Sequence, residues 1–202
     1  MRNWQVKRGV RGDVRFVSKM DPEEVGLVRS LVGSLVELFD EREDSAPHDD
    51  LAELTGLRTG HAEPPPETVL QRLLPDFYRP DANAPGATEA PSGELARDLN
   101  GALRSLNEPE VIDAKRDAAQ TVLATLPERA GTVTLTESEA QDWLTCINDL
   151  RLALGTLLGI TADLPDGPSS EDPARAGHVD VYHWLSAMLD VLVSVMLDRE
   201  PE

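Results

Sequence analysis

The stretch that decides the fold is DWLTCINDLRLALGTLLGI, residues 142–160. Successive residues of a helix lie about 100° apart, which places its large apolar side chains on one continuous face. These side chains are Trp143, Ile147, Leu150, Leu154, Leu157 and Leu158. A face of this width is typical of a helix that packs into a core. Arg151 falls at the edge of that face, so a cation lies beside apolar neighbours.

Arg151 has two interpretations. A guanidinium at the edge of an apolar face needs an anion, carbonyl groups or a path to water. It can form a structural polar clasp, a partly buried salt bridge to Asp21, Glu24 or an acidic residue of the last helix. Alternatively, Arg151 and Asn148 can form a site for a small anion or ligand. We favour the structural interpretation because the sequence has no phosphate-binding loop.

Capping signals mark the starts of two helices. Asp21 precedes a proline and is followed three residues later by Glu24, a capping box that predicts a helix from about residue 22 to residue 39. Thr136 and Glu139 form the same signal before the stretch quoted above. The sequence therefore predicts a strand-to-helix junction at this point, with a short strand at residues 132–135.

Periodicity predicts the other elements. They are a hairpin in WQVKRGVRGDVRFVS, a helix in ETVLQRLLPDFY, and a last helix at 179–199. Between the last two, helices are predicted at 94–106 and 108–126, with Asn107 and Glu110 as a capping box between them. The segment 40–67 contains at most one short helix, at about 51–56. The fold class predicted is mainly α with a minor β element. About five helices form the core beside the N-terminal β-hairpin, which residues 132–135 can extend as a third short strand.

Polar, proline-rich segments interrupt these elements without dividing the chain. They lie at about 42–67, 79–93 and 161–177, and their composition is typical of variable loops. We therefore predict a single domain over residues 1–202.

Charge is distributed unevenly along the chain. The net charge is −18, yet residues 1–19 carry six basic side chains against Asp13 alone. The acidic remainder repels phosphate backbones, which disfavours broad nucleic-acid binding. The basic hairpin, with Lys7, Arg8, Arg11 and Arg15, is either a local contact for DNA or a partner, or it docks on the acidic body.

The sequence contains none of the common catalytic motifs. It has no Gly-rich phosphate loop, no GxSxG and no HExxH. Cys146 is the single cysteine, lies on the apolar flank of its helix and is interpreted as a buried structural thiol. We therefore expect a protein that is not an enzyme and has no catalytic residue and no cofactor.

Metal binding and membrane insertion are also not expected. His178, Asp180 and His183 have the chemistry of ligands, but a spacing of five does not place both imidazoles on one helical face. His48 and His61 lie in acidic loops, where solvated side chains are the usual outcome. No apolar run reaches the roughly 18 residues of a membrane span, and the first residues do not resemble a signal peptide. We expect a cytoplasmic protein.

The motif WLTCINDLRLALGTLLGI resembles the signature of an actinobacterial family of unknown function that includes the AosR-like oxidation-sensing transcriptional regulators. Further matching segments follow in order: DPEEVGLVRSLVGSLVELF, LLPDFYRPD, VTLTESEAQDWL and DVYHWLSAMLDVL. The resemblance implies a cytoplasmic, non-enzymatic regulator. It also implies oxidation sensing by closely spaced cysteines, a switch that Cys146 alone cannot form within this chain.

The function expected is therefore a regulatory or interaction protein that acts through protein contacts or through local DNA contact by the hairpin, with transcription as the process regulated. The alternative is the small-anion sensor built on Arg151 and Asn148. A protein partner is expected. The apolar face of the last helix offers a surface for a partner helix or for a homodimer.

Overall fold

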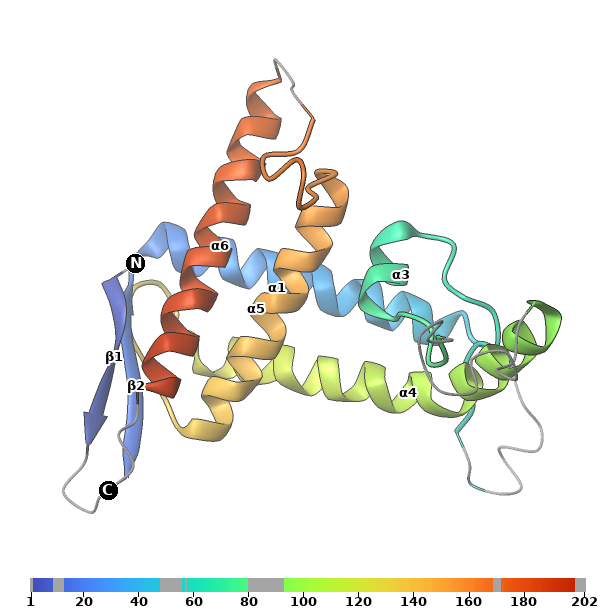
Figure 1. Cartoon of the computed structure of the whole chain (residues 1–202). Helices are drawn as coiled ribbons and strands as arrows, with labels where there is room; N and C mark the ends of the chain where they lie inside the picture. Colours follow the sequence, from blue (N-terminus) through green and yellow to red (C-terminus); the bar gives the residue numbers. More distant parts are fainter. Residues whose placement is uncertain are drawn as a thin grey trace. The chain divides into compact units, whose positions relative to one another are not determined.

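The computed structural model describes residues 2–8, 13–47, 56, 58–79, 93–168 and 172–198. Its elements are β1 Arg2–Arg8, β2 Val14–Met20, α1 Pro22–Asp44, α3 Thr68–Leu73, α4 Gly93–Thr125, β3 Gly131–Leu135, α5 Glu137–Leu157 and α6 Pro173–Leu197 (Figure 1). The mainly α fold with a minor β element is thereby confirmed. The helix predicted at 51–56 lies outside the described residues, apart from Gly56.

The chain divides into two compact units. The first unit comprises residues 1–37 and 115–202, and the second comprises residues 38–114. Helices α1 and α4 each contribute residues to both units. The single domain expected from the sequence stays a prediction.

The sheet of the first unit has β2 at its centre, antiparallel to β1 and to β3. Phe16 of β2 pairs with Val6 on one side and with Leu135 on the other. Phe16 and Leu135 are fully buried. The third strand that the sequence offered at residues 132–135 thus joins the N-terminal hairpin.

Two tryptophans centre the core of the first unit. Trp143 of α5 and Trp4 of β1 meet edge to face, with ring centroids 5.5 Å apart and an interplanar angle of 79°. The Trp143 Nε1 donates a hydrogen bond to Thr125 Oγ1 at 2.8 Å, which satisfies the indole's one polar atom. Helix α6 packs on α5 and on β1 in the same unit. The quoted stretch is therefore a core helix, as its periodicity indicates.

Both capping boxes are present. Asp21 Oδ1 accepts from the backbone N of Glu24 at 2.9 Å, and Glu24 Oε2 accepts from the backbone N of Asp21 at 3.0 Å. Thr136 and Glu139 exchange the equivalent pair of bonds at the start of α5. Helix α1 continues past the predicted end at residue 39 to Asp44, because residues 40–44 are compatible with a helix and Arg42 is buried there.

The prediction of two helices at 94–106 and 108–126 is wrong, because α4 runs unbroken from Gly93 to Thr125 with Pro109 inside it. A proline lacks the N–H that would bond the carbonyl four residues earlier. That carbonyl, on Ser105, instead accepts from the backbone N of Gly60 at 2.8 Å. Asn107 does not cap a helix either, since its Nδ2 donates to the Leu103 carbonyl at 2.7 Å.

Gly60 lies close to the proline ring. A Cβ at residue 60 would lie 3.0 Å from Cγ of Pro109, so a larger residue would require the ring or the loop to shift. Pro109 and Gly60 thus lie in close contact, although 49 residues separate them along the chain.

The predicted start of the last helix is also wrong. Helix α6 begins at Pro173, with Asp172 as its N-cap accepting from the backbone N of Ala174 at 3.0 Å. The first two turns are mostly exposed and contain no large apolar side chain before Val179, so apolar periodicity did not detect them. The cap and the proline at the first helical position were the available signals.

Candidate functional site

Three charged side chains are buried together in the second unit: Arg42 of α1, and Arg104 and Glu108 of α4. We call them the buried charge cluster. Glu108 Oε1 accepts from Arg42 Nε at 2.8 Å, and its Oε2 accepts from Arg104 Nη1 at 2.7 Å. The three side chains are 6%, 2% and 1% exposed in that order. Each charge is therefore held in an interior where it requires its partners.

The remaining donors of the two arginines fix the backbone of nearby loops. Arg42 Nη2 donates to the Glu63 carbonyl at 2.8 Å. Arg104 Nη1 donates to the Leu74 carbonyl at 3.1 Å, and its Nη2 to Asp76 Oδ1 at 3.0 Å. The cluster thus ties the loop before α3 and the turn after α3 to the long helices. Its contacts are those of a structural element.

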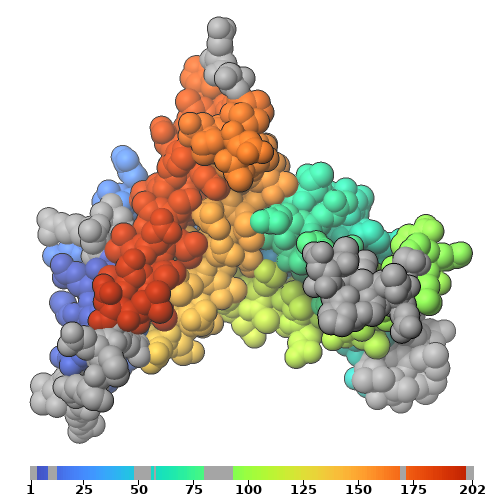
Figure 2. All heavy atoms as spheres, viewed as in Figure 1, coloured from blue at the N-terminus to red at the C-terminus, as the bar shows by residue number. Residues whose placement is uncertain are grey.

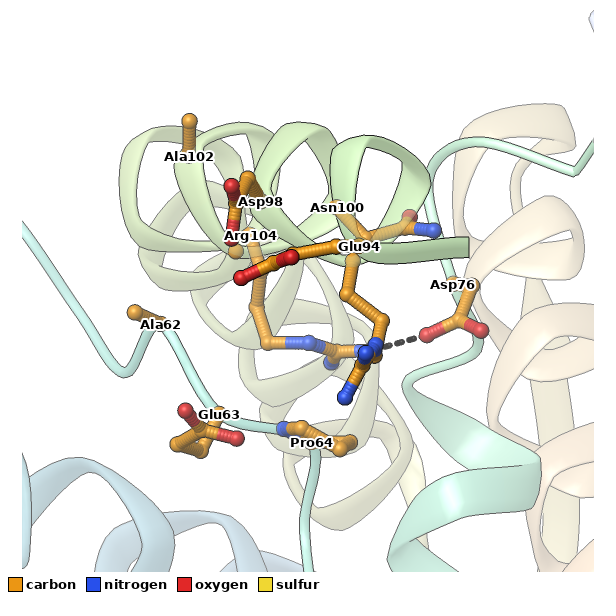
Figure 3. A pocket seen from close by; sticks show the side chains of 11 residues that line it. Ala62, Glu63, Pro64, Asp76, Glu94, Asp98, Asn100, Ala102 and Arg104 are labelled. Atoms are coloured by element: carbon orange, nitrogen blue, oxygen red, sulfur yellow. Dashed lines mark hydrogen bonds and ion pairs between the residues drawn. The ribbon is translucent and has the colours of Figure 1, made fainter. Parts of the chain in front are cut away.

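A cleft of about 510 Å³ lies beside Arg104 in the second unit (Figure 3). It is lined by Ala62, Glu63, Pro64, Asp76, Glu94, Arg97, Asp98, Asn100, Gly101, Ala102 and Arg104. Four carboxylates thus face two guanidiniums, and Arg104 already donates to protein acceptors. This excess of negative charge disfavours phosphates and other anions as occupants.

A second buried ion pair lies in the first unit. Lys115 Nζ contacts both carboxylate oxygens of Asp149 at 2.8 Å. Burial raises the pKa of Asp149 above its ordinary value, and Lys115 opposes that shift only in part. The same desolvation, with the nearby Asp149 charge, raises the pKa of the Cys146 thiol to about 12.

Cys146 is therefore a poor nucleophile. It is 1% exposed, and at neutral pH its sulfur stays protonated. Thiolate is the species that reacts with peroxides and disulfides, so both access and ionisation protect this residue. Burial is as expected for the structural thiol predicted from the sequence.

Arg151 and Asn148 lie together, one turn apart on α5. Arg151 Nη2 donates to Asn148 Oδ1 at 3.0 Å, and Arg151 Nε is buried without a hydrogen-bond partner among the described residues. Asp21 and Glu24, considered as partners from the sequence, instead bond each other at the start of α1. The roles of clasp or anion site for Arg151 stay predictions.

The hairpin brings two of its predicted basic residues face to face. Lys7 of β1 pairs with Arg15 of β2, so both side chains lie on the same side of the sheet. Arg15 Nη2 lies 3.3 Å from Asp13 Oδ2, and Lys7 and Arg8 are exposed. Arg11 lies outside the described residues. The hairpin as a contact for DNA or a partner stays a prediction.

Two of the histidines are engaged locally. His183 Nε2 lies 2.9 Å from Asp166 Oδ1, and His61 Nε2 lies 2.9 Å from the Arg42 carbonyl. His48 is outside the described residues. Within the described ranges, no group of three or more His, Cys, Asp or Glu side chains is placed to hold a metal ion.

The buried ion pairs have no clear signal in the sequence. Arg104 and Glu108 are four residues apart on one helix, a spacing that signals an ion pair. Nothing in that spacing tells a buried pair from an exposed one. Asp149 lies inside the quoted stretch, yet its partner Lys115 comes from another helix, so no local pattern pairs them.

The fold and these sites define a class: a mainly α protein whose buried charges hold its helices and loops together. The chain belongs to the family described as domain of unknown function DUF2017, whose model matches residues 1–196. The family resemblance found in the sequence is thereby confirmed.

Curated relatives cover nearly all of the chain. It is 44% identical over 197 residues to proteins named oxidative stress regulator AosR from Mycobacterium tuberculosis and Mycobacterium bovis, spanning 98% of this chain and 88% of theirs. A Mycobacterium leprae protein named putative oxidative stress regulator AosR is 44% identical over 200 residues, spanning 98% of this chain and 89% of its own. No solved structure matches.

Proposed function

We propose that this chain is a non-enzymatic, cytoplasmic regulator of the response to oxidative stress, and that it acts on transcription through contact with another protein. The observation that carries the proposal is the 44% identity, over 98% of the chain, to proteins named oxidative stress regulators. A relationship of this extent covers both units and supports a shared regulatory role.

The chemistry of the buried sites supports contact rather than catalysis. The arginines of the buried charge cluster donate to Glu108 and to backbone carbonyls of the same unit. Lys115 is bound by Asp149, and the adjacent thiol is protonated at neutral pH. A catalytic group needs a polar atom available to a substrate, and these groups are engaged within the protein.

The raised pKa of Cys146 also bears on how such a regulator receives its signal. With one buried thiol that stays protonated, Cys146 is not the oxidation sensor in this proposal. The response to oxidants then reaches the protein through its partner. Cys146→Ala should therefore leave regulation intact.

A deletion strain of the source organism tests this function. Transcripts are measured after a peroxide challenge in the deletion strain and in strains complemented with the wild type or with Cys146→Ala. We expect the deletion to change the transcript response and both complementing genes to restore it. A deletion strain that responds like its parent would overturn the proposal.

Local DNA contact by Lys7, Arg8, Arg11 and Arg15 is the competing route. A gel-shift assay with promoter fragments of the responding genes separates the two routes. Binding that disappears in Lys7→Glu and Arg15→Glu would assign regulation to DNA contact instead of protein contact, with the salt dependence typical of phosphate binding.

A further inference from the structure

Helix α6 carries two apolar stripes along its length. The first includes Leu185, Met188 and Leu192, which are all buried. The second follows residues spaced alternately three and four apart, the pattern of a helix that packs against another helix. Its members are Val179, Tyr182, Ser186, Leu189, Val193 and Met196, with Leu197 beside the last. The second stripe lies about one quarter of a turn around the helix from the first.

The second stripe is only partly covered. Its residues are half-buried or exposed, and Val193 and Leu197 are 36% and 75% exposed. At its N-terminal end the Tyr182 ring lies against Gly155 of α5, where a Cβ would come within 3.1 Å of the ring. The most exposed part of the stripe thus lies at Val193 and Leu197, with Leu189 and Met196 half-buried beside them. Figure 2 shows α6 at the surface along its length, beside α5.

Helix α6 is unusually apolar for its exposure. It is long and apolar enough to cross a membrane by length and composition, and 17% of its most apolar window is buried. A core helix would be mostly covered. An apolar helix with a partly covered heptad stripe is typical of a surface that another helix completes.

The charges near the second stripe indicate the kind of partner that it would bind. Residues 137–202 contain thirteen acidic residues and three arginines. Two of the arginines are engaged, Arg151 with Asn148 and Arg175 with the Leu158 carbonyl. On α6 itself, Asp180 and Asp190 follow Arg175 without any lysine or arginine, and Asp198 is the C-cap of the helix.

We propose that the second stripe of α6 is the docking site for an amphipathic helix of a partner protein, with apolar anchors three and four residues apart and basic residues on both flanks. This inference rests on the proposed function and names the chemistry of its partner. Apolar anchors would cover Leu189, Val193 and Leu197, and basic flanks would face Asp190 and Asp198. Opposite charge around an apolar centre gives fast and specific association.

Two other occupants fit the surface less well. A second copy of this chain would bring together two acidic surfaces, from chains that each carry a net charge of −18, which opposes a homodimer. A membrane carries anionic lipids on its cytoplasmic leaflet, which attract basic and not acidic helices. The homodimer, which the sequence analysis left open beside a partner helix, therefore becomes an outcome of the test.

The test measures binding of labelled helical peptides to the full-length chain by fluorescence anisotropy. One peptide has leucines at heptad spacing with lysine flanks, and its counterpart has glutamate flanks. We expect the lysine peptide to bind at least about tenfold more tightly, and Val193→Glu and Leu197→Glu each to weaken it by about tenfold or more. Asp190→Lys should reduce the preference for the lysine peptide.

Matched controls come from α4, where Leu95 and Leu106 are 62% and 58% exposed. Leu95→Glu and Leu106→Glu make the same chemical change on another exposed helix and should leave peptide binding unchanged. Circular dichroism confirms that each variant is folded. Equal loss in all four variants, or equal affinity for both peptides, would overturn the inference.

Two further measurements assign the stripe to another occupant if the inference fails. A dimer in light scattering that Leu197→Glu dissociates would assign it to a second copy. Sedimentation with phosphatidylglycerol vesicles, lost in Leu197→Glu, would assign it to a membrane. A normal transcript response in the deletion strain would refute the proposed function while leaving the peptide result intact, so the two failures are distinguishable.

Discussion

The two units of this protein are stabilised differently. Apart from prolines, the described residues of the second unit bury five apolar side chains: Phe39, Leu70, Leu73, Leu74 and Ile112. They bury the charges of Arg42, Arg104 and Glu108 beside them. The first unit instead has a broad apolar core around Trp143 and Phe16, with Asp149 as its buried carboxylate.

The difference shows what a buried carboxylate requires. Glu108 is bound by two guanidiniums, which in turn bind backbone carbonyls, so the charges and donors satisfy one another. Asp149 has one lysine, and burial still raises its pKa. The second unit therefore depends on its ion pairs for shape, whereas the first tolerates a poorly compensated charge because apolar packing holds it.

The largest expected effect comes from Glu108→Ala. It leaves two buried arginines without their carboxylate, and the loss of a partner in a buried ion pair costs about 3–5 kcal/mol of unfolding free energy. Amide hydrogen exchange should rise in residues 58–79 and in the part of α4 around residue 108. Urea denaturation measures the total loss.

Glu110→Ala is the matched control, since Glu110 is exposed on the same helix two residues away. It should change stability by less than about 0.5 kcal/mol, as surface substitutions usually do. If Glu108→Ala behaved like Glu110→Ala, the second unit would not depend on its buried charges and the contrast between the units would be refuted.

The pH dependence of stability tests how the first unit holds the buried carboxyl of Asp149. Because its pKa is raised in the folded protein, the unfolded chain releases this proton first as the pH rises. Stability contributed by the protonated carboxyl is therefore present below the ordinary pKa and is lost as the pH rises through the folded-state pKa. Denaturant midpoints of the wild type, relative to those of Asp149→Asn, should fall across that range.

The comparison with Asp149→Asn removes the contribution of the other carboxylates, which titrate in both proteins. The asparagine leaves Lys115 without its anion, so the variant should be less stable by about 1–3 kcal/mol at a pH where the carboxyl is ionised. A wild type and a variant with parallel pH profiles would show that burial does not perturb this carboxyl.

The sequence predicted the fold to the extent that local signals determine it. The capping boxes at Asp21 and Thr136 and the apolar face around Trp143 gave helices where the structure has them. Pro109 predicts a break that the helix does not have, because a distant backbone N–H, that of Gly60, satisfies the carbonyl freed by the proline. Local sequence cannot reveal such long-range compensation.

The candidate sites were less accessible to prediction for the same reason. Burial of Glu108 results from Arg42, on a helix 66 residues earlier, and from loops tied to both arginines. Arg151 can be singled out in the sequence because it interrupts an apolar face. Arg104 lies in a helix of weaker apolar periodicity, where no such pattern distinguishes it. A charged residue that interrupts a regular apolar pattern can be recognised from the sequence. A buried charged residue in a helix without such a pattern cannot.

Arg151→Met has the smallest expected effect on stability. It compares an arginine of the first unit directly with the arginines of the buried charge cluster. Arg151 is half-buried, makes its hydrogen bond within α5 to Asn148, and leaves Nε without a partner among the described residues. Methionine removes that bond and the unsatisfied donor together, so stability should change by less than about 1 kcal/mol. Arg42→Met, which strips a buried carboxylate of one partner, should cost about 3–5 kcal/mol.

Equal losses in Arg151→Met and Arg42→Met would show that Arg151 is a structural clasp of the same kind as the buried charge cluster. A third outcome would support the alternative function, in which Arg151 and Asn148 bind a small anion. If the wild type gains thermal stability with added inorganic phosphate and Arg151→Met does not, while both are equally stable without it, Arg151 and Asn148 form an anion site. The first unit would then hold a cation with a buried, unsatisfied donor at a ligand site, whereas the buried charge cluster of the second uses its arginines for structure.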